Sequence, residues 1–247
     1  MLEKSVSVLV FMALTSMDSN AVEGKAVDLE QVIDFVPNES GNLLVECASS
    51  LWSYDAESKT TLFSLTPERD RKRCEFAFKG LLNRDSPFSI SFSFKVSERY
   101  DDPDNWHSYF QIHSFPDEGE EWRCPILALE SIGGKLRMYN RWDTHNLSIT
   151  DNGTCADFGN TIESRVLFLP TDFELEGWNK MTIEGLLSTT EDGWLNIYLN
   201  DEQISESNGP NTFNDVLQPY FKIGIYKPTS WGDNSHIQVE FKDVEYR

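Results

Sequence analysis

Residues 106–115 carry side chains that could transfer protons. Successive side chains of a β-strand point to opposite faces, so Tyr109, Gln111 and His113 are expected to share one face, with apolar residues on the other. That face would present a phenol, an amide and an imidazole at steps of about 7 Å. Imidazole and phenol groups serve as general acids and bases, although an ordinary solvated strand is the alternative interpretation.

Two further segments, residues 220–226 and 73–78, separate an apolar face from a polar face in the same way. Their polar faces comprise Tyr220, Lys222, Gly224 and Tyr226 in the first segment and Arg73, Glu75 and Ala77 in the second. We expect Gly224 to leave bare backbone at which a ligand can approach the sheet. Three strands that combine such residues predict a catalytic cleft.

The order of these motifs resembles that of the β-jelly-roll polysaccharide lyases, which include heparin lyase I, glucuronan lyases and jelly-roll alginate lyases. The shared motifs are Arg-x-Glu at 73–75, Gln-Ile-His at 111–113 and Tyr-Phe-Lys-x-Gly-x-Tyr at 220–226, and the likeness runs from about Leu43 to the C-terminus. Alginate lyases usually follow the last Tyr with Asn-Gln, whereas this chain has Lys227-Pro228. The resemblance therefore favours glucuronan as the substrate, with heparin, heparan sulfate and alginate as alternatives.

This resemblance implies cleavage of a uronic-acid polymer by β-elimination, which leaves a 4,5-unsaturated uronate end. The carboxylate beside C5 must be neutralised as charge spreads into it, a role for Arg73 and Gln111. Tyr226 would take the C5 proton or protonate the leaving O4, because nearby cations favour a phenolate. A histidine titrates at about 6.5, so His113 would act as the base when the C5 proton and O4 lie on opposite faces. When they share a face, as in D-glucuronate, His113 would position or neutralise the substrate.

The formal net charge of −20 argues against nucleic acid as a partner, because binding phosphates requires Lys and Arg. An acidic polysaccharide therefore needs a local basic cleft. Basic residues cluster at Arg69, Arg71, Lys72 and Arg73, and Arg137 and Arg141 share a strand face with Tyr139. The residues expected to bind substrate are Tyr109, Tyr220, Lys222, Arg137, Tyr139, Arg141 and Glu75, the last also orienting Arg73.

The N-terminus resembles a secretory signal peptide over residues 1–21. It has Lys4, an apolar run too short to span a bilayer, and Ser-Asn-Ala at 19–21 as a small-x-small cleavage site. A buried N-terminal strand is the alternative, and no other stretch is apolar enough to cross a membrane. The four cysteines, Cys47, Cys74, Cys124 and Cys155, suit disulfides in a secreted protein but leave three pairings open.

The rest of the chain indicates an all-β fold. Residues 22–42 are polar and are expected to form an arm, and residues 43–247 to form a single domain. Strand signals recur between turn residues, notably at 88–96, 126–132, 135–142, 178–187, 193–200, 220–227 and 237–246. Gly133-Gly134 indicates a hairpin, and residues 143–165 are expected to form a flap over the cleft. The prediction is a two-sheet antiparallel jelly roll, a concanavalin-like sandwich with a concave catalytic face.

No cofactor is required by this chemistry, and the cysteine spacing does not suit a zinc site. The acidic stretches 101–104 and 117–121 are expected to be solvated loops, although such loops also suit a structural Ca²⁺ ion. A retaining glycoside hydrolase would need two carboxylates about 5–5.5 Å apart, for which no strand shows the pattern. A non-catalytic carbohydrate-binding jelly roll is the alternative of another class. The sequence thus predicts a secreted, monomeric polysaccharide lyase.

Overall fold

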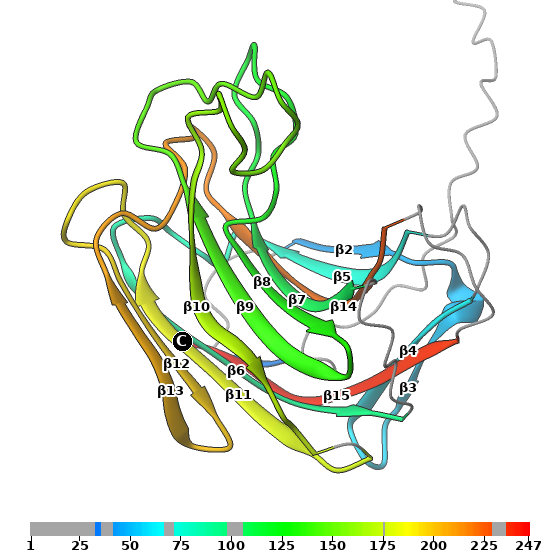
Figure 1. Cartoon of the computed structure of the whole chain (residues 1–247). Coiled ribbons are helices and arrows are strands. Elements are labelled where there is room, and N and C mark those ends of the chain that lie inside the picture. The colour runs from blue at the N-terminus through cyan, green and yellow to red at the C-terminus, as the bar shows by residue number, and fades with distance from the viewer. Residues whose placement is uncertain (1–32, 36–41, 67–71, 98–105, 175, 229–235) are drawn as a thin grey trace, which may run out of the picture.

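The computed structural model describes residues 33–35, 42–66, 72–97, 106–174, 176–228 and 236–247. They form two strongly curved β-sheets packed face to face, with long loops gathered at one end (Figure 1). Apart from the parallel pairing of β1 with β15, the described strand pairs are antiparallel. The predicted two-sheet jelly roll is therefore confirmed.

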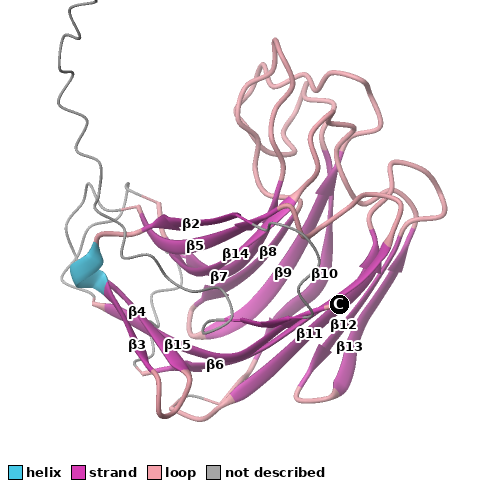
Figure 2. Cartoon of the chain, turned by 180° about the vertical axis from the view of Figure 1, so that it is seen from behind, coloured by secondary structure: helices cyan, strands magenta, loops and turns pink. Residues whose placement is uncertain are grey.

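One sheet has eight strands in the order β13-β12-β11-β6-β15-β4-β3, with β1 beside β15, and the other has seven in the order β10-β9-β8-β7-β14-β5-β2. The eight-stranded sheet contains β1 (Ile33–Phe35), β3 (Trp52–Asp55), β4 (Thr60–Leu65), β6 (Pro87–Val96), β11 (Asn179–Leu186), β12 (Trp194–Leu199), β13 (Glu202–Asn208) and β15 (Ile237–Tyr246). The seven-stranded sheet contains β2 (Asn42–Glu46), β5 (Arg73–Lys79), β7 (Trp106–His113), β8 (Leu127–Ile132), β9 (Lys135–Trp142), β10 (Glu163–Thr171) and β14 (Tyr220–Tyr226). A short 3₁₀ helix, η1 (Ser49–Leu51), precedes β3, and strands dominate the view from behind (Figure 2).

The core lies between the two sheets and is rich in phenylalanine. Along β6 buried apolar residues alternate with half-exposed polar ones, as expected for a strand with one face in the core. Phe92 of β6 stacks on Phe110 of β7, with ring centroids 5.2 Å apart, and Phe63 of β4 meets Phe76 of β5 edge to face at 4.8 Å. Aromatic pairs in these geometries stabilise beyond their buried area. They fix the seven-stranded sheet on its partner.

Most of the expected strands are confirmed to within one or two residues at each end, and Gly133-Gly134 forms the turn between β8 and β9. Residues 163–165, expected to be irregular, instead begin β10. Strands β2, β3, β4, β10 and β13 were not among the predicted strands. Segments 1–21 and most of 22–42 lie outside the described residues. Within the latter, β1 pairs with the end of β15. No helix in the described part of the chain is long and apolar enough to span a bilayer.

Both cysteine pairs form disulfides, Cys47–Cys74 and Cys124–Cys155. The first joins the end of β2 to β5. The second joins the segment before β8 to the loop between β9 and β10, residues 143–162. Disulfides of this loop length restrict the unfolded chain and typically contribute about 3–4 kcal/mol. The first disulfide is buried in the core between the sheets, and the second ties the 143–162 loop to the segment before β8.

Candidate active site

The concave face of the seven-stranded sheet holds a cavity of about 650 Å³. Its floor comes from strands of this sheet, and one wall comes from the loops around residues 122–125 and 154–155. The lining residues are Glu46, Arg73, Trp106, Ser108, Gln111, His113, Trp122, Arg123, Cys124, Pro125, Ala128, Glu130, Arg141, Thr154, Cys155, Tyr220, Lys222 and Tyr226. All four residues predicted to be catalytic therefore line one cavity, and the 143–162 loop contributes to its wall, as expected of a flap.

Strand register explains why these residues meet. β14 lies between β5 and β7, and Tyr226 pairs with Arg73 on one side and with Ser108 on the other. Lys222 pairs with Gln111 across the β14–β7 ladder. Directly opposed residues of antiparallel strands place their side chains on the same face. Segments more than a hundred residues apart in sequence thus deliver their polar side chains to one surface.

One carboxylate, that of Glu46 on β2, binds two of the cations of the site, Arg73 and Lys222. Its Oε2 atom lies 2.7 Å from Nη1 of Arg73 and 2.7 Å from Nζ of Lys222. Burial alone would raise the pKa of Glu46, but Lys222 and Arg73 outweigh that effect and hold the pKa below its ordinary value. Arg73 keeps a half-exposed side chain (40%), and a guanidinium has five N–H donors. Arg73 can therefore hold Glu46 and still donate to a ligand.

Glu75 lies deeper, beneath the same two cations. Its Oε1 atom accepts a hydrogen bond of 3.1 Å from Nε2 of Gln111, while Oε2 lies 3.7 Å from Arg73 and 3.8 Å from Lys222. Burial raises the pKa of Glu75 to about 7 although both cations oppose that rise. Glu75 was expected to orient Arg73 and forms an ion pair with it, although the shorter contact to Arg73 comes from Glu46. Glu75 also orients Gln111, whose second amide N–H can face the cavity.

His113 stands at one end of this group. Its ring stacks on Tyr220 with centroids 5.8 Å apart, and Nδ1 lies 3.0 Å from both the carbonyl oxygen and the backbone nitrogen of Ser114. In the tautomer whose Nδ1–H donates to that oxygen, Nε2 is unprotonated and can accept a proton. Burial, with Lys222 second, lowers the pKa of His113 to about 4. The ring is therefore neutral at pH 7, which suits a base or hydrogen-bonding role better than charge neutralisation.

Tyr226 occupies the other end. The guanidinium of Arg73 lies 5.2 Å from the centre of its ring, and Trp106 packs against it with ring centroids 5.9 Å apart. The arrangement places a group that can exchange protons beside the residue that can bind a substrate carboxylate.

Tyr109 is a correction to the sequence prediction, because it faces the core and not the cavity. A bulge in β7 interrupts the register with β8 between Ser108 and Phe110. Such an extra residue breaks the alternation of faces, so Tyr109 and Phe110 both point inward and Tyr109 is 2% exposed. Its hydroxyl lies 2.7 Å from Nε2 of His107, and burial raises the pKa of Tyr109. Ser108 takes the place at the cavity that was expected for Tyr109.

Gly224 also has a different role from the one expected. Its φ angle is +133°, and a Cβ atom there would collide with the carbonyl oxygen of Cys74 and lie 2.7 Å from the Cα of Glu75 on β5. A bulge between β14 and β7 begins at the neighbouring Ile223. The glycine therefore permits close approach of β5, and Gly224 is not among the residues that line the cavity.

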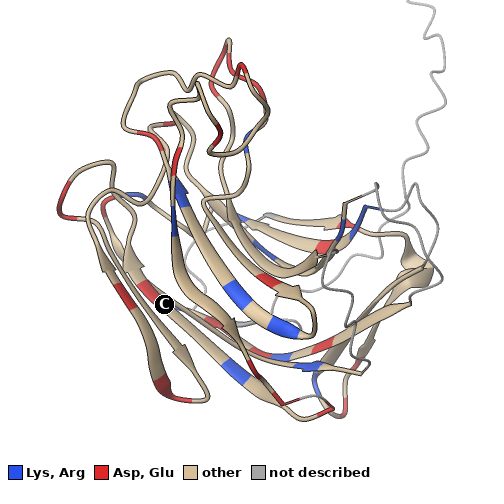
Figure 3. Ribbon diagram, viewed as in Figure 1, with Lys and Arg blue, Asp and Glu red and all other residues tan. Residues whose placement is uncertain are grey.

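Of the predicted substrate-binding residues on strand β9, only some line the cavity. Arg141 lines the cavity, whereas Arg137 and Tyr139 lie on the same face of β9 outside its lining residues. Both guanidiniums lie over the Tyr139 ring, 5.0 and 5.3 Å from its centre, and Nε of Arg137 donates to Glu130 over 2.9 Å. Figure 3 shows Lys and Arg positions along strands of this sheet, β9 among them, while many Asp and Glu positions lie in loops. Of the predicted early cluster, Lys72 is exposed, and Arg69 and Arg71 lie outside the described residues.

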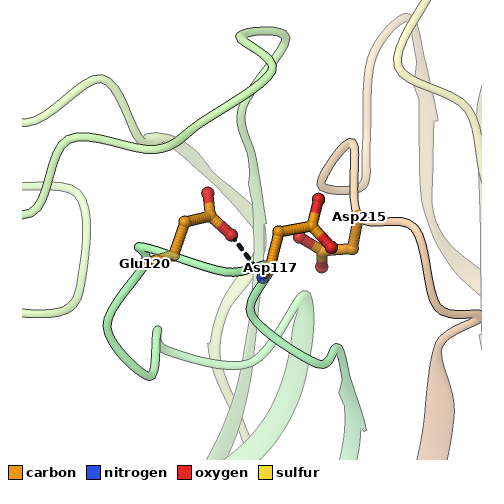
Figure 4. Close-up of side chains that lie close together, drawn as sticks. All are labelled: Asp117, Glu120 and Asp215. Atoms are coloured by element: carbon orange, nitrogen blue, oxygen red, sulfur yellow. Dashed lines mark hydrogen bonds between the residues drawn. The ribbon is translucent and has the colours of Figure 1, made fainter.

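Acidic residues gather in one loop region, where Asp117, Glu120 and Asp215 place ligand-type oxygens within 4.8 Å of one another (Figure 4). Arg123 donates to Glu120 over 2.9 Å and also to Asp215. A buried guanidinium therefore already balances much of this negative charge. Ca²⁺ binding by the acidic loops stays a prediction, and the stretch 101–104 lies outside the described residues.

The cavity residues that were not singled out from the sequence include Glu46, Trp106, Trp122 and Arg123. Glu46 precedes Cys47, and the cysteine pairing would have pointed to it had the partner been known, since Cys74 follows Arg73. Trp106 belongs to the segment that was recognised, but its position at the strand start carried no separate signal. Trp122 and Arg123 lie in an acidic loop whose course no periodicity predicts.

A two-sheet jelly roll with Tyr, His, Gln and Arg gathered on a concave face is the arrangement expected of a polysaccharide lyase. The family model "Polysaccharide lyase" matches residues 16–242, and the chain belongs to this family. No curated protein matches the chain.

Solved structures of lyases share the fold. An endo-β-1,4-glucuronan lyase from the fungus Trichoderma reesei has a TM-score of 0.59 at 15% identity, covering 76% of this chain and 80% of that one. The alginate lyase AlyC3 has a TM-score of 0.54 at 15% identity, with 80% and 78% covered. The alginate lyase AlyA1 from Zobellia galactanivorans has a TM-score of 0.53 at 12% identity, with 81% of each chain covered. At these identities the likeness establishes the fold.

Proposed function

We propose that the protein is a secreted, monomeric lyase that cleaves a uronic-acid polysaccharide by β-elimination, with glucuronan as its leading substrate. The observation that carries this proposal is the single cavity in which Tyr226, Arg73, Gln111 and His113 meet. Membership of the polysaccharide lyase family supports the reaction class. The two disulfides support secretion, because disulfides persist in oxidising compartments.

In the proposed reaction the substrate carboxylate lies against Arg73 and Gln111. Their N–H groups neutralise the charge that develops on this carboxylate as the C5–H bond breaks. Preorganised donors in a partly buried cavity stabilise such charge more than water does. Lys222, held by Glu46, adds positive charge beneath the same position. Arg141 and Tyr220 extend the polar surface along the sheet, with Arg137 and Tyr139 beyond them for a longer chain.

The proton transfers are assigned to Tyr226 and His113. For glucuronate, in which the C5 proton and O4 share a face, the phenolate of Tyr226 takes the C5 proton. The electron pair of the C5–H bond then forms the C4=C5 double bond, the C4–O4 bond breaks, and the Tyr226 hydroxyl returns the proton to O4. With an epimer whose C5 proton lies on the opposite face, the neutral His113 accepts that proton and Tyr226 protonates O4.

Glucuronan is favoured by the motif around Tyr226, which lacks the Asn-Gln of alginate lyases, and by the glucuronan lyase among the structural neighbours. Heparin, heparan sulfate and alginate are the alternative substrates. A binding protein without catalysis would not need an ordered set of proton-transfer and carboxylate-binding groups, so the cavity favours an enzyme.

Ultraviolet absorbance tests the proposal, because elimination creates an absorbing 4,5-unsaturated uronate and hydrolysis does not. The purified protein is mixed separately with glucuronan, heparin, heparan sulfate, alginate and hyaluronan. We expect a rise with glucuronan that Tyr226→Phe abolishes and that Tyr198→Phe, on the other sheet, leaves unchanged. Retained binding to an affinity gel without any rise would favour the carbohydrate-binding alternative. If none of the five polysaccharides gives an absorbance rise and none binds, the proposed function is refuted for these substrates.

A further inference from the structure

Trp122 is an exposed aromatic side chain at the wall of the cavity. It is 56% exposed, yet it lines the same space as His113 and Lys222. Large aromatic side chains that stay accessible beside a polar cavity mark binding surfaces. No step of the proposed elimination uses Trp122, so its position calls for a separate explanation.

The backbone beneath Trp122 is firmly held. The next residue, Arg123, is 4% exposed. It donates hydrogen bonds of 2.9 Å to Glu120 and to Ser148, and its guanidinium lies 4.4 Å from the centre of the Phe213 ring. Cys124 follows, in a disulfide with Cys155. An exposed ring on an anchored backbone loses little conformational freedom when a ligand covers it.

The contacts of Trp122 also define its position relative to the groups proposed to react. The Trp122 ring meets His113 edge to face at 5.8 Å and Phe115 at 6.4 Å. A second tryptophan, Trp106, packs on Tyr226 at the opposite end of the cavity. Along β7 the distance from Ser108 to His113 is about 17 Å at about 3.4 Å per residue. The two tryptophans thus bracket a charged centre that is longer than one sugar ring.

We propose that Trp122 stacks on a pyranose ring of the polyuronide next to the His113 end of the site, which makes it a substrate-positioning residue. The C–H face of a pyranose is apolar and packs on an indole, while the ring's carboxylate remains in water. This inference deepens the proposed function and rests on it. Contact with a ring remote from the broken bond stabilises ground state and transition state alike, so it acts on KM and not on kcat.

The test measures binding without cleavage. In a Tyr226→Phe background, calorimetry follows the binding of a saturated β-1,4-glucuronate hexasaccharide, and of equivalent alginate and heparin oligosaccharides. The variants compared are Trp122→Ala, Trp122→Phe and a control, Phe158→Ala, whose ring is 92% exposed but does not line the cavity. The same substitutions in the native Tyr226 background give kcat and KM.

We expect Trp122→Ala to weaken binding and raise KM about three- to tenfold, the size of one aromatic stacking contact. Trp122→Phe should lie between, and Phe158→Ala should match the parent in both assays. Parent-like binding and KM for Trp122→Ala would overturn the inference and leave the lyase intact. Weakened binding without any elimination product would keep the stacking role and refute the reaction. Failure of the parent to bind any of the oligosaccharides would overturn the inference as well.

Discussion

The carboxylate of Glu46 lies 2.7 Å from the ammonium of Lys222, whose side chain is 2% exposed. The same Oε2 atom receives a hydrogen bond from Arg73, so Glu46 joins β2 to β5 and β14 across the face of the sheet. Removing a buried ammonium from water is costly unless a carboxylate pairs with it. Glu46 therefore positions Arg73 and Lys222 in the site.

We expect Glu46→Gln to lower kcat/KM about 10- to 100-fold, because hydrogen bonds to charged groups are worth about 1.5–3 kcal/mol. Initial rates by ultraviolet absorbance measure the effect, with circular dichroism to show an intact fold. Glu202→Gln, which removes an exposed carboxylate from β13, serves as the control. An unchanged kcat/KM in a folded Glu46→Gln protein would contradict the positioning role.

Glu75 should make stability depend on pH in a direction that its burial dictates. Its pKa rises from an ordinary 4.5 to about 7 in the folded protein, so the native state holds the proton more tightly than the unfolded chain. The stabilising contribution is complete below about pH 4.5 and is lost as the pH rises through about 7.

The loss amounts to about 3 kcal/mol at 1.36 kcal/mol per pH unit. Urea unfolding at several pH values compares the parent with Glu75→Gln, which carries no titrating carboxyl at this position. Between about pH 4.5 and about pH 7 the unfolding free energy of the parent should fall relative to that of Glu75→Gln. A constant difference over that range would show that Glu75 is ionised throughout.

His113 should set an acid limit to activity well below the ordinary histidine range. Burial and Lys222 lower its pKa to about 4, so at every pH above that value the imidazole is neutral and can bind the substrate by hydrogen bonds or, with a C5 epimer, accept its proton. The free enzyme's kcat/KM should fall as the pH drops through about 4, and a limb near pH 6.5 would contradict this assignment. The unfolding free energy should also fall as the pH is lowered, because the native state favours the neutral form of His113. Its stabilising contribution is present above about pH 6.5 and is lost as the pH falls through about 4.

Many strands could be predicted from the sequence because one face of each is apolar and the other is polar. The alternation in β6 and β14, and the turn at Gly133-Gly134, are local signals that need no knowledge of the partner strand. β13 was missed because it is an edge strand with few apolar residues. Its conformation depends on pairing with β12, which no pattern within the segment reports.

The side chains of the site were predicted correctly where the strand is regular. The prediction was wrong where a bulge interrupts the pairing of the strands. Gln111, His113, Lys222 and Tyr226 lie on the expected face, but the bulge beside Ser108 turned Tyr109 into the core. A one-residue irregularity reverses faces from that point, and only the paired strand reveals it. Glu46 is missed for a related reason, since its contact with Lys222 spans 176 residues of sequence.

Arg123 supplies a test of how the cavity wall is held. Its side chain is 2% exposed and pairs with Glu120 and Asp215, which are 2% and 3% exposed. Removing one partner of a buried ion pair leaves uncompensated charge, at a cost of about 3–5 kcal/mol. We expect Arg123→Met to lower the unfolding free energy by that amount in urea titrations.

The matched control is Arg247→Met, which breaks the solvent-exposed pair with Glu245 and should cost less than about 1 kcal/mol. Burial already raises the pKa of Asp215 against the opposing effect of Arg123, so part of the penalty can be relieved by protonation at low pH. The destabilisation by Arg123→Met should accordingly shrink as the pH falls toward 4. Equal effects of the two substitutions at neutral pH would mean that the acidic residues around Arg123 find other compensation.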